Sequence, residues 1–214
     1  MSIKKIDKIR SDYKKSEIDF KNLPKCPIQM FQSWLECALQ YDEDSAICFV
    51  LSTVSEKQLP TSRVVLLRDI TQDGFVFFTN YNSKKSRDIQ INHFVSANFF
   101  WKDLEKQVRI LGEAHKIPDL DSDKYFNTRP RKSQLGAWVS QQSSIIGFSE
   151  DLNSKIEEIN KKFNKIDVAR PSYWGGYCII PKQIEFWQGK PSRLHDRLLF
   201  CKEEEGWKRC RLSP

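Results

Sequence analysis

The residue types best suited to chemistry gather near the end of the sequence, where two arginines, a histidine and an aspartate follow a short turn. This stretch runs from Ile184 to Arg197 and reads IEFWQGKPSRLHDR. Its first residues alternate like a β-strand, which Gly189 and Pro191 then break. Arginine binds phosphate or carboxylate, and histidine titrates near neutral pH. The stretch therefore predicts either an anion-binding turn beside a sheet or a hairpin whose basic residues are only solvated.

Other basic residues lie within or just after β-type segments, beside hydroxyl, amide and aromatic groups. This combination suits a phosphorylated aromatic cofactor, because cations and hydroxyls hold phosphate, amides bond to a ring edge and tryptophan packs apolar parts. Nucleic acid uses similar residue types, but here the basic residues are scattered singly and no stacking motif appears. The candidates are Arg63, Arg68, Lys84, Lys85, Gln107, Ser143, Trp187, Arg193 and Arg197.

A short predicted helix after Ser83 carries Lys84, Lys85 and Arg87 in its first turn. Cations are disfavoured there, because the N-terminus of a helix is already partly positive. Two explanations remain open. Either an anion such as phosphate binds at this end of the helix, or all three side chains simply point into water.

Composition limits the class of protein. The 214 residues suit one domain, and the 12% aromatic content favours a packed core over disorder. A net charge of +7 points to anionic partners. The six cysteines form no CxxC pair and have no nearby histidine at zinc-ligand spacing, so we expect no metal site and a reducing compartment, the cytoplasm. No apolar run approaches the ~20 residues of a membrane span, so we expect no membrane partner.

Hydrophobic patterning predicts the elements that position these groups. Alternating β-type runs predict strands over 47–54, 62–68, 75–79, 94–101, 106–117, 177–180, 183–188, 197–202 and 206–212. Helical spacing predicts helices over 27–38, after Ser83, within 119–140 and from Ser149. The turn signal at 72–74 predicts a hairpin between the second and third strands. Successive strands with short links predict a mainly β fold, an antiparallel sheet closed into a barrel with flanking helices.

The first residues of the chain differ from the rest. Residues 1–24 are polar and charged, so we expect a mobile N-terminal arm. No repeat, low-complexity segment or clear linker follows, so we expect a single domain over 25–214.

Seven stretches, collinear along the chain, resemble the pyridoxamine 5'-phosphate oxidase family. They are RVVLLR at 63–68, GFVFFTNYNSKKSRDI at 74–89, FFWKDLEKQVRILG at 99–112, YFNTRPRKSQLGAW at 125–138, QQS at 141–143, WGGY at 174–177 and FWQGKPSRLHDR at 186–197. So many collinear motifs make chance similarity negligible. The resemblance covers roughly residues 10–214 and implies a split β-barrel that works as a homodimer, with FMN bound at the subunit interface.

The resemblance also implies two sets of binding residues. Contacts to FMN are expected from Arg63, Val64, Val65, Leu66, Phe78, Thr79, Lys84, Lys85, Gln107, Gln142, Ser143, Trp187 and Arg197. Contacts to the substrate are expected from Arg10, Tyr13, Arg68, Tyr125, Arg129, Ser133, Arg193, Leu194 and His195, with Arg193 and His195 at the reacting carbon. Independently of the resemblance, Tyr125, Arg129 and Ser133 step by four residues, so on one helix they would share a face and grip one phosphate.

The activity implied is FMN-dependent oxidation of pyridoxamine or pyridoxine 5'-phosphate to pyridoxal 5'-phosphate, a step of vitamin B6 biosynthesis and salvage. Molecular oxygen is the electron acceptor and gives hydrogen peroxide, with ammonia released from the amine. One alternative is a related flavin reductase or oxidase with another substrate, and another is a non-enzymatic basic module that binds nucleic acid or stores a cofactor. The RLHDR run argues against the first alternative. Where the family usually has lysine, this chain has Arg68, which keeps the charge but changes the hydrogen-bond geometry.

Overall fold

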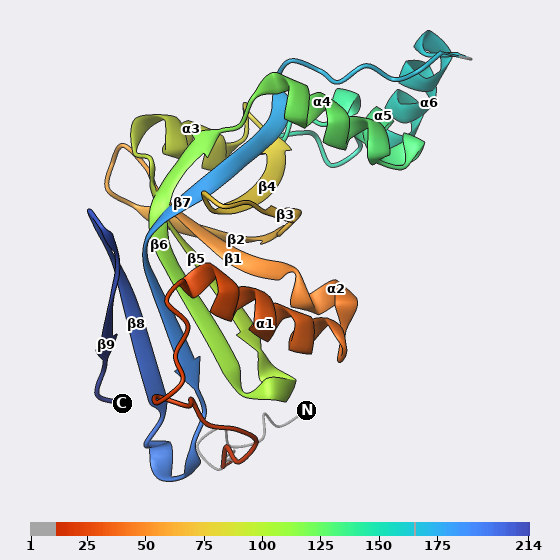
Figure 1. Ribbon diagram of the computed structural model, residues 1–214. Helices are drawn as coiled ribbons and strands as arrows, with labels where there is room; N and C mark the ends of the chain where they lie inside the picture. Colours follow the sequence, from red (N-terminus) through yellow and green to blue (C-terminus); the bar gives the residue numbers. More distant parts are fainter. Residues whose placement is uncertain (1–11, 165) are drawn as a thin grey trace. The chain divides into compact units, whose positions relative to one another are not determined.

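The computed structural model of the protein describes residues 12–164 and 166–214 (Figure 1). These residues form two compact units, each assembled from separate segments of the chain. The first unit comprises the described part of Met1–Phe49, together with Ala97–Leu111 and Pro181–Pro214, and the second comprises Val50–Ser96 and Gly112–Ile180. The long strands therefore contribute residues to both units.

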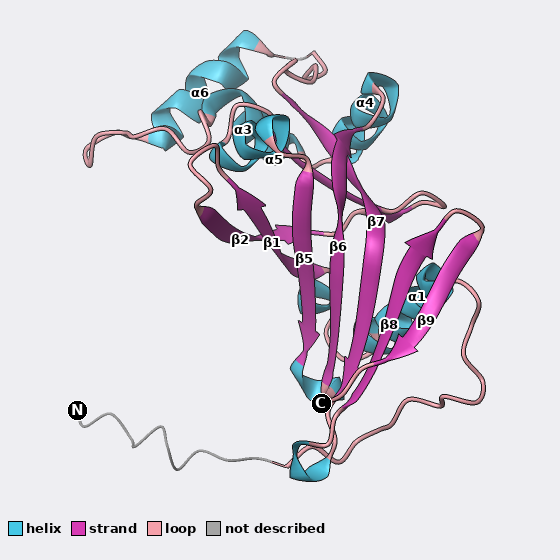
Figure 2. Cartoon of the chain, turned by 90° about the vertical axis from the view of Figure 1, so that its left-hand side faces the viewer, coloured by secondary structure: helices cyan, strands magenta, loops and turns pink. Residues whose placement is uncertain are grey.

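The described residues are mainly β-strands, and every strand pair with a determined register is antiparallel. The strands are β1 (Cys48–Val54), β2 (Pro60–Leu66), β3 (Asp69–Ile70), β4 (Phe75–Asn80), β5 (Phe94–Trp101), β6 (Lys106–Lys116), β7 (Trp174–Gln188), β8 (Asp196–Glu203) and β9 (Gly206–Arg211). Their order is β2-β1-β5-β6-β7-β4-β3, with β8 on β7 and β9 on β8 (Figure 2). The predicted class, an antiparallel sheet with flanking helices, is confirmed.

Two helices precede the first strand in the sequence, and the others lie between strands. They are α1 (Pro27–Leu39), α2 (Glu43–Ala46), α3 (Lys84–Ile91), α4 (Asp119–Thr128), α5 (Arg131–Val139) and α6 (Leu152–Lys162), with short 3₁₀ turns η2 (Lys102–Leu104) and η3 (Pro191–Arg193). No helix within the described ranges combines the length and hydrophobicity that a membrane-spanning segment needs.

The core of the first unit forms between α1 and the sheet. The predicted apolar stripe of α1 is buried, and its aromatic residues meet strand residues edge to face. Phe31 packs 5.0 Å from Phe99, and Trp34 packs 5.2 Å from Phe186, measured between ring centroids. Such pairs contribute about 0.5–1.5 kcal/mol each beyond the burial of their area. The prediction of this helix is therefore confirmed, together with the face that it buries.

The second unit corrects the predicted hairpin. Residues 72–74 do turn the chain, but the two strands that they join are the short β3 and β4, with Asp69 opposite Val76. β2 instead lies beside β1. On its other edge β4 pairs with β7, from Phe75 opposite Ile179 to Asn80 opposite Trp174. A turn signal fixes where the chain reverses but leaves open how much of each flanking run pairs.

Three further boundaries differ from the sequence-based expectation. The two strands expected over 177–188 form one continuous strand, β7. The last helix begins at Leu152 rather than Ser149, because Asp151 caps it by accepting a hydrogen bond from the backbone N–H of Asn153. The helical region 119–140 is broken at Arg129, whose backbone is extended because Pro130 follows it.

Candidate functional site

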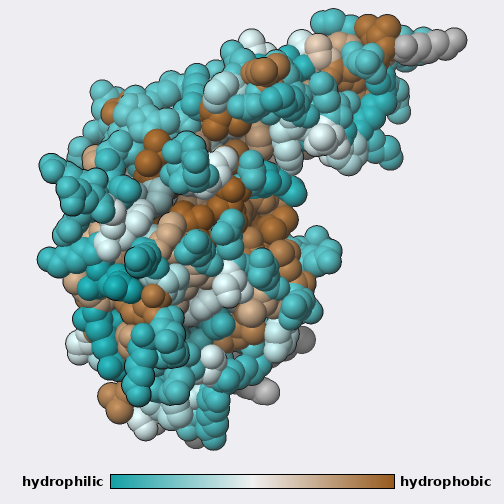
Figure 3. Space-filling model, viewed as in Figure 1, coloured by the Kyte–Doolittle hydropathy of each residue, from teal (hydrophilic) through white to brown (hydrophobic). Residues whose placement is uncertain are grey.

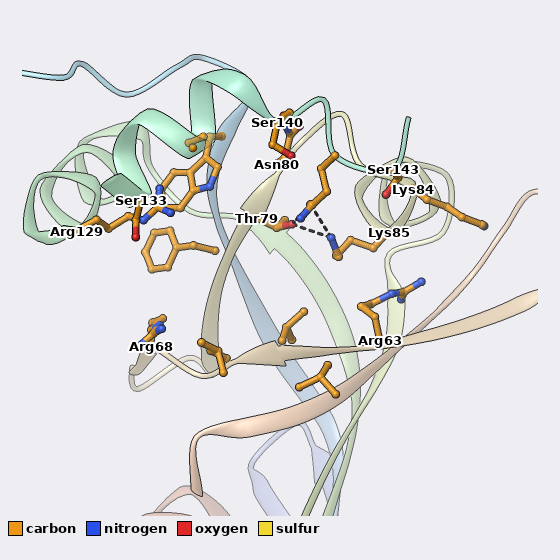
Figure 4. Close-up of a pocket in the computed structure, with 18 of the residues that line it drawn as sticks. Arg63, Arg68, Thr79, Asn80, Lys84, Lys85, Arg129, Ser133, Ser140 and Ser143 are labelled. Carbon is orange, nitrogen blue, oxygen red and sulfur yellow. Dashed lines mark hydrogen bonds between the residues drawn. The ribbon is translucent and has the colours of Figure 1, made fainter. Parts of the chain in front are cut away.

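A cavity of about 870 Å³ opens in the second unit (Figure 4). It brings together many of the predicted residues, namely Arg63, Val64, Val65, Leu66, Arg68, Phe78, Thr79, Lys84, Lys85, Tyr125, Arg129, Ser133, Gln142 and Ser143. Five cations, Arg63, Arg68, Lys84, Lys85 and Arg129, are among the described residues that line it, and no aspartate or glutamate is. A cavity of this composition attracts an anion.

One end of the cavity is built around a buried lysine at the start of α3. Lys85 is only 7% exposed, and its ammonium group donates to Thr79 Oγ1 at 3.0 Å, Ser83 Oγ at 3.2 Å and Gln142 Oε1 at 2.9 Å. All three acceptors are neutral. Burial, assisted by the nearby charge of Arg63, lowers the pKa of Lys85 to about 8. Ser83 precedes the helix as predicted, but its hydroxyl bonds to side chains instead of capping the helix.

Arg63 and Lys84 at the same end are held by a buried aspartate. The guanidinium of Arg63 donates to Thr53 Oγ1 at 2.9 Å and to Thr61 Oγ1 at 2.6 Å, and Thr53 in turn donates to Asp88 at 2.8 Å. Lys84 approaches Asp88 at 3.4 Å. Sequence reasoning missed Asp88, although its position four residues after Lys84 on α3 was the available signal.

The loop that follows α5 closes this end. Thr79 Oγ1 donates to Gln142 Oε1 at 3.1 Å, and Asn80 Nδ2 donates to the carbonyl oxygen of Ser140 at 3.1 Å. Ser143 adopts a positive φ of 73° and lines the cavity. Hydrogen bonds from β4 therefore fix the loop that carries Gln142 and Ser143, two of the residues predicted to bind the cofactor.

The other end of the cavity gathers two guanidiniums, a phenol and a hydroxyl (Figure 4). Arg129 lies over the ring of Trp174 at 4.4 Å, and its buried Nη1 has no hydrogen-bond partner among the described residues. Burial lowers the pKa of Arg129; Tyr125 opposes this shift, and the charge of Arg68 adds to it. An unpaired buried N–H is costly, so a hydrogen-bond acceptor at this position would be stabilising.

The predicted single-helix face for Tyr125, Arg129 and Ser133 is wrong in detail. Tyr125 belongs to α4 and Ser133 to α5, and Arg129 lies in the extended link between them. All three nevertheless line the same cavity. The three residues therefore meet at one cavity, as their spacing suggested, although the helix is broken at Arg129.

Apolar groups separate the two polar ends. Phe78 stacks on Tyr125 with ring centroids 3.9 Å apart, and Val64 and Leu66 on β2 remain 63% and 37% exposed. The space-filling view shows hydrophobic surface over β2 to β4 (Figure 3). The labelled side chains of Figure 4 place Arg63, Lys84, Lys85 and Ser143 on one side and Arg68, Arg129 and Ser133 on the other. The cavity is therefore suited to flat rings between two anionic groups.

The remaining predicted residues belong to the first unit. Trp187 and Arg197 are directly opposite on β7 and β8. Arg197 donates to Glu185 Oε1 at 2.8 Å and to the carbonyl oxygen of Ser213 at 2.8 Å, while Gln107 donates to Asn98 at 2.8 Å. Arg193 and Leu194 are exposed in the turn after β7. Arg10 lies outside the described residues.

His195 has a defined partner on one side of its ring. Its Nδ1 lies 3.1 Å from the backbone N–H of Lys190 and accepts a hydrogen bond from it. Burial, together with the charge of Arg193, lowers the pKa of His195. Because Nδ1 accepts this hydrogen bond, the neutral imidazole carries its proton on Nε2.

Two family models match this chain. Residues 39–163 match the model described as "Pyridoxamine 5'-phosphate oxidase", and residues 174–214 match "Pyridoxine 5'-phosphate oxidase C-terminal dimerisation region".

Curated relatives align over nearly the whole sequence. A protein of Haemophilus influenzae (strain 86-028NP) named "Pyridoxine/pyridoxamine 5'-phosphate oxidase" is 46% identical over 206 residues, covering 96% of this chain and 98% of the relative. A protein of the same name from Neisseria gonorrhoeae (strain ATCC 700825 / FA 1090) is 43% identical, with the same coverage.

Solved structures share the fold. PhzG from Burkholderia lata 383, determined in complex with tetrahydrophenazine-1-carboxylic acid, aligns with a TM-score of 0.88 at 24% identity, covering 95% of this chain and all of that one. A pyridoxamine 5'-phosphate oxidase-related, FMN binding protein of Nostoc punctiforme PCC 73102 aligns with a TM-score of 0.71 at 15% identity, covering 86% of this chain and 97% of that one. These similarities confirm the predicted fold class.

The pKa of Lys85 generates a prediction about binding of FMN, the cofactor that the family resemblance implies. A bound phosphate favours the charged ammonium, so affinity should be highest below pH 8 and fall as Lys85 loses its proton above that value. We expect the dissociation constant of FMN, measured by flavin fluorescence on apoprotein, to rise by up to about tenfold from pH 8 to pH 9. Lys85→Arg stays charged and should lose this dependence. An identical pH profile in that variant would contradict the assignment.

Proposed function

The chain belongs to the pyridoxamine 5'-phosphate oxidase family, and we propose from this premise that it oxidises pyridoxamine and pyridoxine 5'-phosphate to pyridoxal 5'-phosphate. The amine reaction consumes oxygen and water and releases hydrogen peroxide and ammonia. The alcohol reaction consumes oxygen and releases hydrogen peroxide. The enzyme would serve vitamin B6 biosynthesis and salvage in the cytoplasm, as a homodimer with FMN at its subunit interface. The description of the model that matches residues 174–214 as a dimerisation region supports the homodimer.

The observation that carries this proposal is the presence of two cationic ends on one cavity. Both the cofactor FMN and the substrate combine a flat aromatic ring system with a phosphate, which is carried on a ribityl chain in FMN and on a methylene group in the substrate. A cavity that offers buried cations at each end and apolar groups between them fits two such molecules with their rings adjacent. The buried Nη1 of Arg129 and the neutral acceptors around Lys85 leave both ends short of an anion.

The end around α3 fits the phosphate of FMN. Lys85, Lys84 and Arg63 supply charge there, and Ser143 adds a hydroxyl from the loop after α5. Thr79 and Gln142 fix the position of the Lys85 ammonium. The ring system of FMN would be contacted by Val64, Val65, Leu66 and Phe78. The family resemblance also assigns cofactor contacts to Gln107, Trp187 and Arg197. When bound, FMN supplies the acceptor for two electrons and the site of reaction with oxygen.

The end around Arg129 fits the phosphate of the substrate. Arg129 and Arg68 supply charge, and the hydroxyls of Tyr125 and Ser133 line the same end. Charged hydrogen bonds of this kind contribute about 1.5–3 kcal/mol each. Placing the phosphate there would direct the substrate ring toward the apolar middle of the cavity, next to Phe78.

Arg193, Leu194 and His195 are assigned to the substrate, with Arg193 and His195 at its reacting carbon. The exposed guanidinium of Arg193 would orient the substrate and favour loss of its proton through positive charge. His195, neutral and protonated on Nε2, would donate a hydrogen bond to a ring substituent of the substrate. Arg10 and Tyr13 are assigned to the substrate more weakly. Of these two residues, only Tyr13 lies within the described part of the chain.

The proposed function is tested by two measurements on the purified protein. The protein should be yellow with a flavin absorption band, and pyridoxamine 5'-phosphate should cause release of hydrogen peroxide with formation of pyridoxal 5'-phosphate. A colourless protein that binds nucleic acid would favour the basic-module alternative. A flavin-loaded protein that releases no peroxide with either phosphorylated substrate would overturn the proposal in favour of another flavin enzyme.

The division of roles around the turn after β7 gives a separate prediction. Arg193→Ala should lower kcat/KM by about 10- to 100-fold, the worth of one charged hydrogen bond. Its flavin content should be unchanged, because Arg193 is assigned to the substrate alone. Lys132→Ala removes an exposed cation that does not line the cavity and serves as the matched control. Loss of FMN from Arg193→Ala would show that the roles of Arg193 and Arg197 have been divided wrongly.

A further inference from the structure

We propose that Glu105 is a positioning residue that holds residues 13–18 against the turn carrying Arg193 and His195, and that it thereby sets the affinity for the substrate. The inference rests on the proposed function of that turn. It concerns only the first unit, where all of these residues lie.

The carboxylate of Glu105 binds the backbone of the N-terminal segment. Its Oε2 accepts the backbone N–H of Lys14 at 2.7 Å and that of Lys15 at 2.9 Å. The residue is only 9% exposed. Hydrogen bonds from backbone N–H groups to a carboxylate are stronger than those between neutral groups. The segment predicted to be a mobile arm is therefore fixed at this point by its main chain, whatever side chains it carries.

The same residue also holds the end of β7. The carbonyl oxygen of Glu105 accepts the backbone N–H of Gly189 at 2.8 Å and the side-chain amide of Gln188 at 3.1 Å. Gly189 and Gln188 directly precede the turn that carries the substrate residues. Glu105 therefore bonds the N-terminal segment with its side chain and the start of the turn with its backbone.

The backbone conformation of Glu105 does not explain why a glutamate occupies this position. Its φ of 55° lies in the left-handed region at the end of η2, where glycine or asparagine is favoured. A non-glycine residue held in that region is strained. The two hydrogen bonds made by the carboxylate account for a glutamate here.

The segment that Glu105 holds places an aromatic ring on the substrate residues. The ring of Tyr13 packs 5.5 Å from that of Trp187 and 5.7 Å from that of His195, both edge to face. Gly189 leaves room for it, since a Cβ there would lie 2.6 Å from Tyr13 Cγ. Two views show the chain after residue 12 running beside the turn between β7 and β8 (Figures 1 and 2).

The far end of the segment is anchored to the same turn. The backbone N–H of Ile18 donates to Asp196 Oδ2 at 3.3 Å, and Lys190 lies 3.4 Å from the carboxylate of Glu17. Glu105 thus holds the start of the segment, while Asp196 and Lys190 hold its end. Loss of Glu105 should release Tyr13 from His195 and leave Ile18 in place.

The test compares three variants of the FMN-loaded enzyme. Glu105→Gly removes the carboxylate but keeps a residue suited to the left-handed backbone, so the turn can still form. Glu105→Gln keeps one acceptor oxygen and serves as the conservative rescue. Asp103→Ala removes an exposed carboxylate from the same turn and is the matched control.

Two readouts are expected to move together. Limited trypsin digestion, followed by mass spectrometry, should cut after Lys14 and Lys15 on the order of tenfold faster in Glu105→Gly, since the loss of two charged hydrogen bonds frees these N–H groups. The KM for pyridoxamine 5'-phosphate should rise by a similar factor, with kcat and flavin content changed less than twofold. Glu105→Gln should be less affected, and Asp103→Ala should match the unmodified enzyme.

The result that overturns the inference is an active Glu105→Gly enzyme whose trypsin cleavage and KM equal those of the unmodified protein. A Glu105→Gln variant as affected as Glu105→Gly would also contradict it, because the acceptor oxygen would then be irrelevant. Failure of the proposed function is distinguishable, since it appears as absent turnover in the unmodified protein. The trypsin readout does not depend on turnover.

Discussion

The proposed binding site depends on two cationic groups, the Lys85 ammonium and the buried Nη1 of Arg129, that have no negatively charged hydrogen-bond partner among the described residues. Lys85 is held by three neutral oxygens, and Arg129 keeps a buried N–H that bonds to no described residue. Burying a charge in this way is unfavourable unless an anion completes the site. The folded protein carries this cost at both ends of one cavity, and bound phosphate removes it at each. The proposed binding of two phosphorylated ligands therefore rests on the surroundings of the Lys85 ammonium and of Arg129 Nη1.

Strand β4 helps to hold the two ends of the cavity at a fixed separation. β4 is paired to β7 along its length, so Thr79 and Phe78 are fixed relative to each other on one strand. Thr79 orients Lys85 at one end, and Phe78 stacks on Tyr125 toward the other. Asp88 adds a further constraint, because it balances Lys84 and, through Thr53, holds Arg63. Sites built on strands and helices hold their geometry better than sites built on loops alone.

Much of this arrangement was predictable from residue types, and the rest depended on tertiary contacts. The apolar stripe of α1 is a local signal, and the helix that it predicted is confirmed. The cations after Ser83 left two explanations open, and the structure places Lys84 and Lys85, but not Arg87, among the residues that line the cavity. Asp88 and Trp174 were not among the predicted site residues, because each contacts the site through a residue distant in sequence. Asp88 accepts a hydrogen bond from Thr53, and Trp174 packs under Arg129. The shared face inferred from the four-residue spacing required one continuous helix, and Pro130 breaks that helix at Arg129. The cofactor and substrate roles of individual residues, and the single domain over 25–214, remain predictions.

The most direct test of the central claim compares the two ends of the cavity. Lys85→Gln and Arg129→Gln each remove one cation from the cavity. The dissociation constant of FMN and the KM of pyridoxamine 5'-phosphate at saturating FMN are measured for both. We expect Lys85→Gln to weaken FMN binding by about 10- to 100-fold with little change in KM, and Arg129→Gln to raise KM by a similar factor with FMN binding unaffected. Equal weakening of both ligands in both variants would contradict this expectation.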